Sequence, residues 1–197
     1  MAKDEELLSE LTVSNTKKKF LTVISNCLQG IEPTKLTSGD VKHIMLWEAI
    51  SSYTPTLPLK LKCEACYQDI DITVDLRKIN SVELPSDFKQ PQDIQLDKMA
   101  KIRLATLADE IAIVDYAMLG QSSYLYSFAL TLIDNNSIID TLNYISALPT
   151  QELAKIKEWH KKYQHGPDML APYKCPLCDW EGNVEIPFRL DRLFQIG

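Results

Sequence analysis

Two short stretches of the sequence match each other, LKCEAC at residues 61–66 and YKCPLC at residues 173–178. Each contains a Cys-x-x-Cys pair preceded by lysine. Alternating apolar residues follow both pairs, first at 70–76 and then at 184–190. Period-two alternation is typical of a half-buried strand. The sequence therefore predicts two similar β-hairpins, each with a cysteine pair in its turn.

A Cys-x-x-Cys turn brings two sulfurs to one side of a tight loop. Two such turns supply four thiolates, which fill the tetrahedral coordination sphere of zinc at about 2.3 Å and leave no position for water or substrate. Such a site is structural. The sequence predicts one structural Zn²⁺ bound by Cys63, Cys66, Cys175 and Cys178.

The two pairs are far apart in the chain, whereas a compact ribbon separates them by about 15–20 residues. The cost of closing a loop grows only with the logarithm of its length, and a structural zinc contributes on the order of 10–16 kcal/mol in small peptide sites. We therefore expect a split zinc ribbon. The alternatives are two unrelated pairs of buried or redox cysteines, iron in place of zinc, and His165 as a spare ligand.

Helical periodicity dominates the rest of the chain. It predicts helices over residues 4–29, from Thr37 to about 50, and over 104–118, 124–133, 138–148 and 150–164. Thr37 with Asp40, Asp109 with Glu110, and Thr150 are the expected helix-start residues. The expected fold class is α+β, a mainly helical protein with a split zinc ribbon made of two Cys-x-x-Cys hairpins.

The expected organisation follows from these patterns. It comprises an N-terminal helical region (1–58), a first zinc-knuckle hairpin (59–77), a connector (78–97), a helical insertion (98–166), and a second knuckle with the C-terminal tail (167–197). Cys27 lies on the apolar face of the first helix and is expected to be a small core residue. Four apolar residues lie close to the C-terminus: Leu190, Leu193, Phe194 and Ile196. We expect them either to dock on a partner or to pack on the protein's own core.

Composition restricts the function. The 197 residues are 45% hydrophobic and 24% charged, with a net charge of −6, so a normal core is expected and a nucleic-acid role is disfavoured. No signal peptide or membrane span is evident, and a reducing cytoplasm favours metal over disulfides. His43, His160 and His165 have no nucleophile or carboxylate at a readable spacing, and no phosphate-binding loop is present. No catalytic residues are predicted.

The C-terminal block combines His165, Gly166, Pro167, Tyr173, Cys175, Cys178, Trp180, Gly182, Ile186, Pro187 and Phe188, with Cys63 and Cys66 in the first knuckle. This combination resembles the baseplate hub subunits and hub assembly proteins of T-even-type contractile-tailed bacteriophages. The resemblance implies a non-enzymatic structural or assembly protein whose partners are other baseplate and hub proteins. It also implies a location in the host cytoplasm during assembly, and leaves open whether the protein stays in the tail baseplate of the virion.

A second class of function stays open from the residues alone. Zinc ribbons commonly serve as adaptor proteins in transcription or RNA processing. That hypothesis requires a basic patch near the knuckles, for which the candidates are Lys60, Lys62 and Lys174. Neighbouring aspartates and glutamates oppose it. A redox enzyme that uses one cysteine pair is a third reading, although neither pair has the βαβ setting of a thioredoxin-like dithiol.

Overall fold

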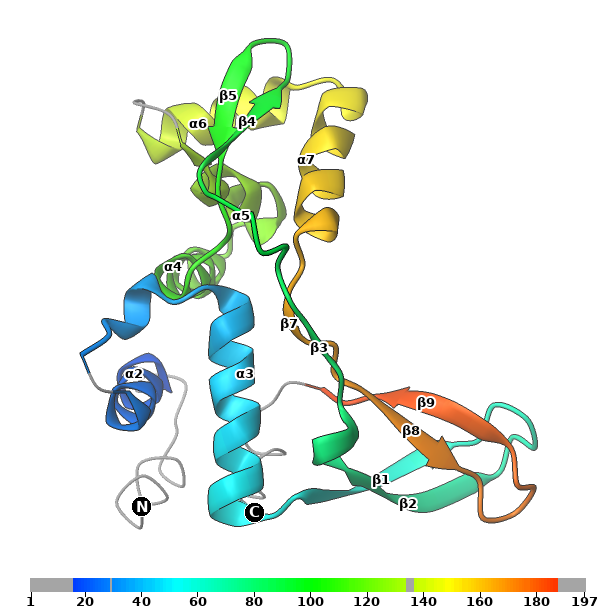
Figure 1. The fold of residues 1–197 in the computed structure, drawn as a ribbon. Coiled ribbons are helices and arrows are strands. Elements are labelled where there is room, and N and C mark those ends of the chain that lie inside the picture. The colour runs from blue at the N-terminus through cyan, green and yellow to red at the C-terminus, as the bar shows by residue number, and fades with distance from the viewer. Residues whose placement is uncertain (1–15, 29, 134–136, 188–197) are drawn as a thin grey trace. The chain divides into compact units, whose positions relative to one another are not determined.

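The computed structural model describes residues 16–28, 30–133 and 137–187. Within these residues the chain is α+β, with six α-helices and small antiparallel sheets (Figure 1). It divides into two compact units. Of the described residues, the first unit contains 16–28, 30–31, 42–82 and 166–187, and the second contains 32–41, 83–133 and 137–165. Helix α3, Ser38–Glu48, contributes residues to both.

The first unit is built mainly from two hairpins. Strand β1 (Thr56–Lys62) pairs with β2 (Asp69–Asp75), and β8 (Leu170–Lys174) pairs with β9 (Glu181–Glu185), both antiparallel. Its other elements are α2 (Thr16–Cys27), the π-helix η2 (Ala49–Tyr53), the 3₁₀ helix η3 (Leu76–Lys78) and the paired strands β3 (Ser81–Val82) and β7 (Gly166–Pro167). The two predicted hairpins are therefore present.

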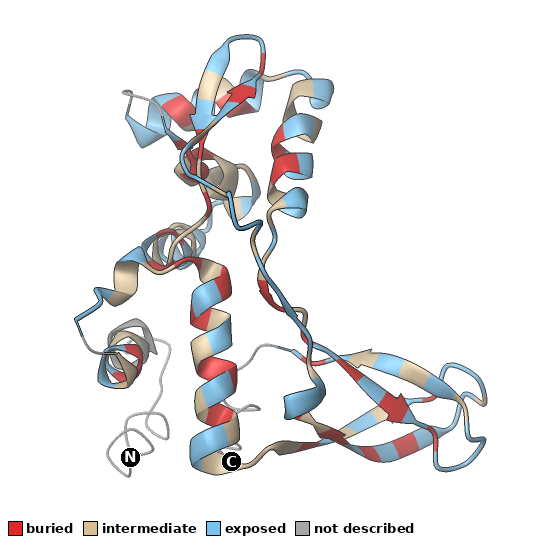
Figure 2. Cartoon of the chain, viewed as in Figure 1, coloured by how far each residue is buried: buried red, intermediate tan, exposed pale blue. Residues whose placement is uncertain are grey.

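Alternation along the strands explains how the hairpins form a core. Ile70, Ile72 and Val74 of β2 are buried, while Asp71 and Thr73 between them are exposed, which Figure 2 shows as alternating colours along the strand. Ala171 and Tyr173 are the buried residues of β8. Strands β2 and β8 pack against each other. Each hairpin thus buries one face, as the period of two requires.

Two details of the hairpins concern where they begin and turn. Gly182 and Asn183 lie inside β9, because the turn is formed by residues 175–180. The first hairpin was expected to begin at residue 59, but β1 begins at Thr56 and includes Pro58, opposite Thr73. A proline is tolerated there because β1 is an edge strand of a two-stranded sheet.

The second unit combines helices with a small sheet. Its helices are η1 (Pro33–Lys35), α4 (Leu107–Met118), α5 (Ser123–Thr131), α6 (Ile138–Ala147) and α7 (Thr150–Lys162). Strands β4 (Gln92–Gln95), β5 (Met99–Ile102) and β6 (Leu132–Ile133) form an antiparallel sheet in that order. The predicted helices are present with nearly the expected bounds. Their core contains Ile102, Ile145, Ile156 and Trp159.

The sheet of the second unit was not predicted. Residues 78–97 were expected to be an extended connector and contain β3 and β4, while β5 and β6 interrupt the stretch that was expected to be helical. These strands have only two to four residues. So short a strand shows no period, and its pairing depends on contacts with distant residues.

Helix starts follow the expected chemistry with one exception. The Asp40 backbone N–H donates to Thr37 Oγ1 at 3.2 Å, as a cap at the start of α3 should. The carboxylate of Asp109 accepts from the backbone N–H of Thr106 at 2.8 Å at the start of α4. Thr150 was expected to be a cap but is the first helical residue of α7, whose cap is Pro149.

Candidate metal centre

The two cysteine turns have the same backbone conformation. In the first, the Cys63 N–H donates to the Gln68 carbonyl at 2.9 Å, and in the second the Cys175 N–H donates to the Trp180 carbonyl at 2.8 Å. The residue after each second cysteine has a positive φ, 58° at Tyr67 and 59° at Asp179. The sequence match therefore extends to the fold of both turns.

The four sulfurs of these turns form one cluster. Cys63 Sγ lies 3.8 Å from Cys178 Sγ, and Cys66 Sγ lies 3.9 Å from Cys175 Sγ. All four sulfurs lie within 4.8 Å of one another. A tetrahedron with metal–sulfur bonds of about 2.3 Å has edges of about 3.8 Å, whereas a disulfide measures about 2.05 Å. The cluster therefore has the donor set and spacing to hold a metal ion.

Burial differs among the four cysteines. Cys63 and Cys175, the first of each pair, are fully buried, whereas Cys66 is half-buried and Cys178 is exposed. The backbone N–H of Leu177 donates to Cys175 Sγ at 3.4 Å. Backbone N–H groups of this kind stabilise a thiolate. The centre thus lies at the ends of the two hairpins, with one side toward solvent.

Backbone and thiol contacts move the cysteine pKa values in opposite directions. Hydrogen bonding by the backbone of Cys66 is the main cause that lowers the pKa of Cys63 to about 7, against the opposing effect of burial. A backbone hydrogen bond from Trp180 acts to lower the pKa of Cys178. Burial and the neighbouring thiols outweigh this hydrogen bond and raise the pKa of Cys178 to about 12. Four sulfurs so close together cannot all ionise without a cation.

Aromatic residues support the second turn. The rings of Tyr173 and Trp180 meet edge to face with centroids 5.8 Å apart. A Cβ at Gly182 would lie 2.3 Å from the Trp180 ring, so only glycine leaves room for the indole across β9. Burial, followed by the negative charge of Cys63 and Glu64, raises the pKa of Tyr173. The aromatic pair therefore supports the turn that carries Cys175 and Cys178.

The lysines near the turns do not form a basic patch. Lys60 lies 3.7 Å from the carboxylate of Asp71, and Lys174 lies 3.0 Å from that of Asp179. Lys62 stands opposite Asp69 in the register of the first hairpin. Each lysine therefore faces an acidic residue. This arrangement disfavours phosphate binding at the knuckles.

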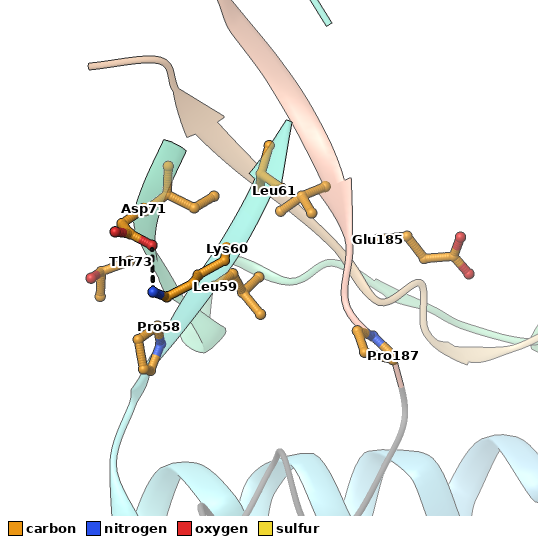
Figure 3. A pocket seen from close by; sticks show the side chains of 10 residues that line it. Pro58, Leu59, Lys60, Leu61, Asp71, Thr73, Glu185 and Pro187 are labelled. Carbon is orange, nitrogen blue, oxygen red and sulfur yellow. Dashed lines mark ion pairs between the residues drawn. The ribbon is translucent and has the colours of Figure 1, made fainter. Parts of the chain in front are cut away.

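A groove lies on the first unit between the two hairpins. It has a volume of about 800 Å³, and Figure 3 shows the Lys60–Asp71 ion pair among the side chains that line it. Apolar side chains of Leu59, Leu61 and Val184 form much of its lining. Its charged and polar lining residues are Lys60, Asp71, Thr73 and Glu185.

Other residues singled out from the sequence lie elsewhere. His165 is not part of the cysteine cluster. Its ring is hydrogen-bonded to Thr37 Oγ1 at 2.6 Å and to the Tyr163 carbonyl oxygen at 3.2 Å. His160 Nε2 lies 3.0 Å from Thr131 Oγ1. Cys27 is half-buried and also outside the cluster. Three groups of residues singled out from the sequence lie outside the described residues. They are the apolar residues near the C-terminus, Phe188 of the resemblance, and residues 4–15 of the first expected helix.

Sequence reasoning missed one buried ion pair. Arg103 donates to both carboxylate oxygens of Asp109, at 2.6 and 3.0 Å, and also to the Leu130 carbonyl. Asp109 was expected only to start a helix. The two residues are six positions apart, and neither helical nor strand periodicity predicts an ion pair at that spacing.

Among the described residues, every helix is too short or too polar to cross a membrane. Neither a curated protein nor a solved structure matches the chain. A family model described as T4 bacteriophage base plate protein matches residues 1–195, which is nearly the full length. The chain therefore belongs to the T4 bacteriophage base plate protein family.

Proposed function

We propose that this protein is a non-enzymatic structural or assembly component of the baseplate hub of a contractile phage tail, folded around one structural zinc ion. The family match supports the baseplate role. The observation that carries the metal assignment is the cluster of four sulfurs within 4.8 Å of one another. The hub assignment rests on the resemblance of the C-terminal block.

Zinc is the metal that this donor set favours. Four cysteine sulfurs at tetrahedral spacing are typical of a closed structural zinc site. Bound zinc would supply no reaction, only a cross-link between the two hairpins. In that arrangement Cys63, Cys66, Cys175 and Cys178 are the ligands, and the two hairpins are halves of a split zinc ribbon. The metal then joins parts of the chain that are 109 residues apart from Cys66 to Cys175.

The contacts of the histidines and the lining of the groove fit a structural role. The histidines are engaged in hydrogen bonds with Thr37, Thr131 and Ser81. The groove on the first unit is lined by prolines, aliphatic residues, Thr73, Glu185 and the Lys60–Asp71 ion pair. We therefore assign the surface of the protein to contacts with other baseplate and hub proteins, in the host cytoplasm during assembly and in the virion if it is retained.

Deletion of the gene from its phage tests the baseplate role. We expect lysates of the deletion mutant to lack complete baseplates in negative-stain electron micrographs, and expression of the intact protein in trans to restore them. Expression of a variant without one cysteine pair should fail to do so. Normal baseplates in the deletion mutant would refute the proposal.

The adaptor alternative has a separate test. A nucleic-acid-binding adaptor should bind DNA or RNA with an affinity that falls steeply as salt rises. Because Lys60 and Lys174 face aspartates, we expect no binding even at low salt. Salt-dependent binding in an electrophoretic mobility shift assay would support the adaptor role instead.

A further inference from the structure

Helix α4 of the second unit is apolar but barely buried. Only Leu107 and Asp109, both in its first turn, are buried. Val114 is 51% exposed, Met118 is 59% exposed, and Leu119 at the end of the helix is 75% exposed. A helix of this composition normally hides such side chains from water. The exposed side of α4 therefore has the character of an interaction surface.

Two of these exposed residues, Val114 and Met118, lie on one face of the helix together with the half-buried Ile111. Ile111, Val114 and Met118 follow one another at steps of three and four, which places their side chains on one line along α4. We name these three residues the α4 stripe. Tyr116 of the opposite face stacks on Tyr126 of α5, with ring centroids 4.0 Å apart. The stacking anchors α4 on its inner side and leaves the stripe facing outward.

Acidic residues flank the stripe. Helical geometry places Glu110 on one side of it and Asp115 on the other, and both are exposed. Glu110 also accepts a hydrogen bond from Ser38 Oγ at 2.8 Å, which fixes its carboxylate in place.

The surrounding sequence offers no positive charge. Residues 104–154 contain no lysine, arginine or histidine. The charge of their acidic residues alone is −6, as large as the net charge of the whole chain. A second copy that docked through its own α4 stripe would bring carboxylates against Glu110 and Asp115, and like charges across an interface are unfavourable. The complementary surface has apolar side chains flanked by lysine or arginine.

We propose that the α4 stripe docks another baseplate protein through apolar side chains flanked by lysine or arginine. This inference rests on the proposed function and names the surface through which it is carried out. An amphipathic helix with a basic rim is the simplest element of this chemistry. Apolar contacts then provide affinity, while Glu110 and Asp115 orient the partner and accelerate its association.

The binding experiment uses the full chain loaded with zinc, immobilised for biolayer interferometry. The probes are the other baseplate proteins of the same phage, each purified separately. One double variant, Val114→Asp with Met118→Asp, removes the apolar contact, and a second, Glu110→Lys with Asp115→Lys, reverses the flanking charge. Ile139→Asp on α6, where the side chain is 66% exposed, and Glu158→Lys on α7 are matched controls. Circular dichroism and zinc content confirm folding.

We expect one baseplate protein to bind the intact chain, and each double variant to bind it at least about tenfold more weakly, as loss of a central contact normally does. Charge reversal should also flatten the salt dependence of association, and the controls should bind normally. Unchanged binding by both double variants would refute the inference while leaving the proposed function intact. Failure of every baseplate protein to bind the intact chain would contradict both.

Two other occupants would also overturn the inference. Concentration-dependent self-association that disappears in the Val114→Asp, Met118→Asp variant would assign the stripe to a second copy. Tighter partner binding after removal of residues 188–197 would assign it to the chain's own C-terminal segment.

Discussion

Removal of the metal should unfold the two hairpins of the first unit and leave the second unit intact. All four cysteines belong to the first unit. The perturbation is a double substitution, Cys175→Ser with Cys178→Ser, or the same change at Cys63 and Cys66. Either change leaves two thiolates, which are too few for a closed zinc site.

The expected magnitude follows from the length of the closed loop. Closing 109 residues instead of about 20 costs roughly 1.5 kcal/mol more by the logarithmic rule. A four-thiolate zinc contributes about 10–16 kcal/mol, so most of its contribution remains after closure. A whole domain is typically stable by only about 5–15 kcal/mol. The free energy lost with the metal should therefore exceed the free energy of unfolding that the hairpins have without it.

Hydrogen exchange followed by mass spectrometry measures this result by segment. Peptides that cover β1, β2, β8 and β9 should lose protection in either double variant, while those covering β5 and α7 should keep it. Elemental analysis should find one zinc per intact chain and none in either variant. Cys27→Ser is the matched control, because Cys27 lies outside the cluster. Full protection of metal-free hairpins, or one zinc retained after loss of either pair, would refute the reasoning.

Three further predictions concern the second unit. Asp109→Asn should lower its free energy of unfolding by about 2–4 kcal/mol, because Arg103 stays partly buried without its carboxylate; urea denaturation measures the change. Gly39→Ala should lower the same quantity by about 1–3 kcal/mol, because the new Cβ would lie 2.6 Å from the His165 carbonyl oxygen. Burial lowers the pKa of His160, so the fold favours its neutral form. The contribution of His160 to stability should be complete above pH 6.5 and fall as pH drops below that value, so the slope just below pH 6.5 should be shallower in His160→Gln.

Exposed positions supply the controls for these substitutions. Asp87→Asn in the loop before β4 and Lys161→Ala on α7 should each change the free energy of unfolding by less than about 0.5 kcal/mol, since both side chains are exposed. Effects of Asp109→Asn or Gly39→Ala as small as those of the controls would contradict the contacts described above. A slope just below pH 6.5 that is unchanged in His160→Gln would contradict the role of His160.

The elements of the fold with a clear local pattern could be predicted. Alternating residues predicted both hairpins, because burial of one sheet face imposes a period of two. Spacing at three and four residues predicted α4 to α7, because one face of each helix meets a core. Thr37 with Asp40 marked the start of α3, since capping involves neighbours within one turn. The candidate metal ligands were likewise readable from their spacing within each pair.

The sequence by itself therefore determined the local elements and the chemistry of each cysteine turn. Only the tertiary structure decided that the sulfurs of Cys66 and Cys175 lie 3.9 Å apart, that Arg103 meets Asp109, and that His165 bonds Thr37 and not the cysteines. It also decided that the stripe on α4 faces outward. The physical reason is range: periodicity and capping depend on neighbours along the chain, whereas these contacts arise from packing between distant segments, which leaves no regular spacing in the sequence.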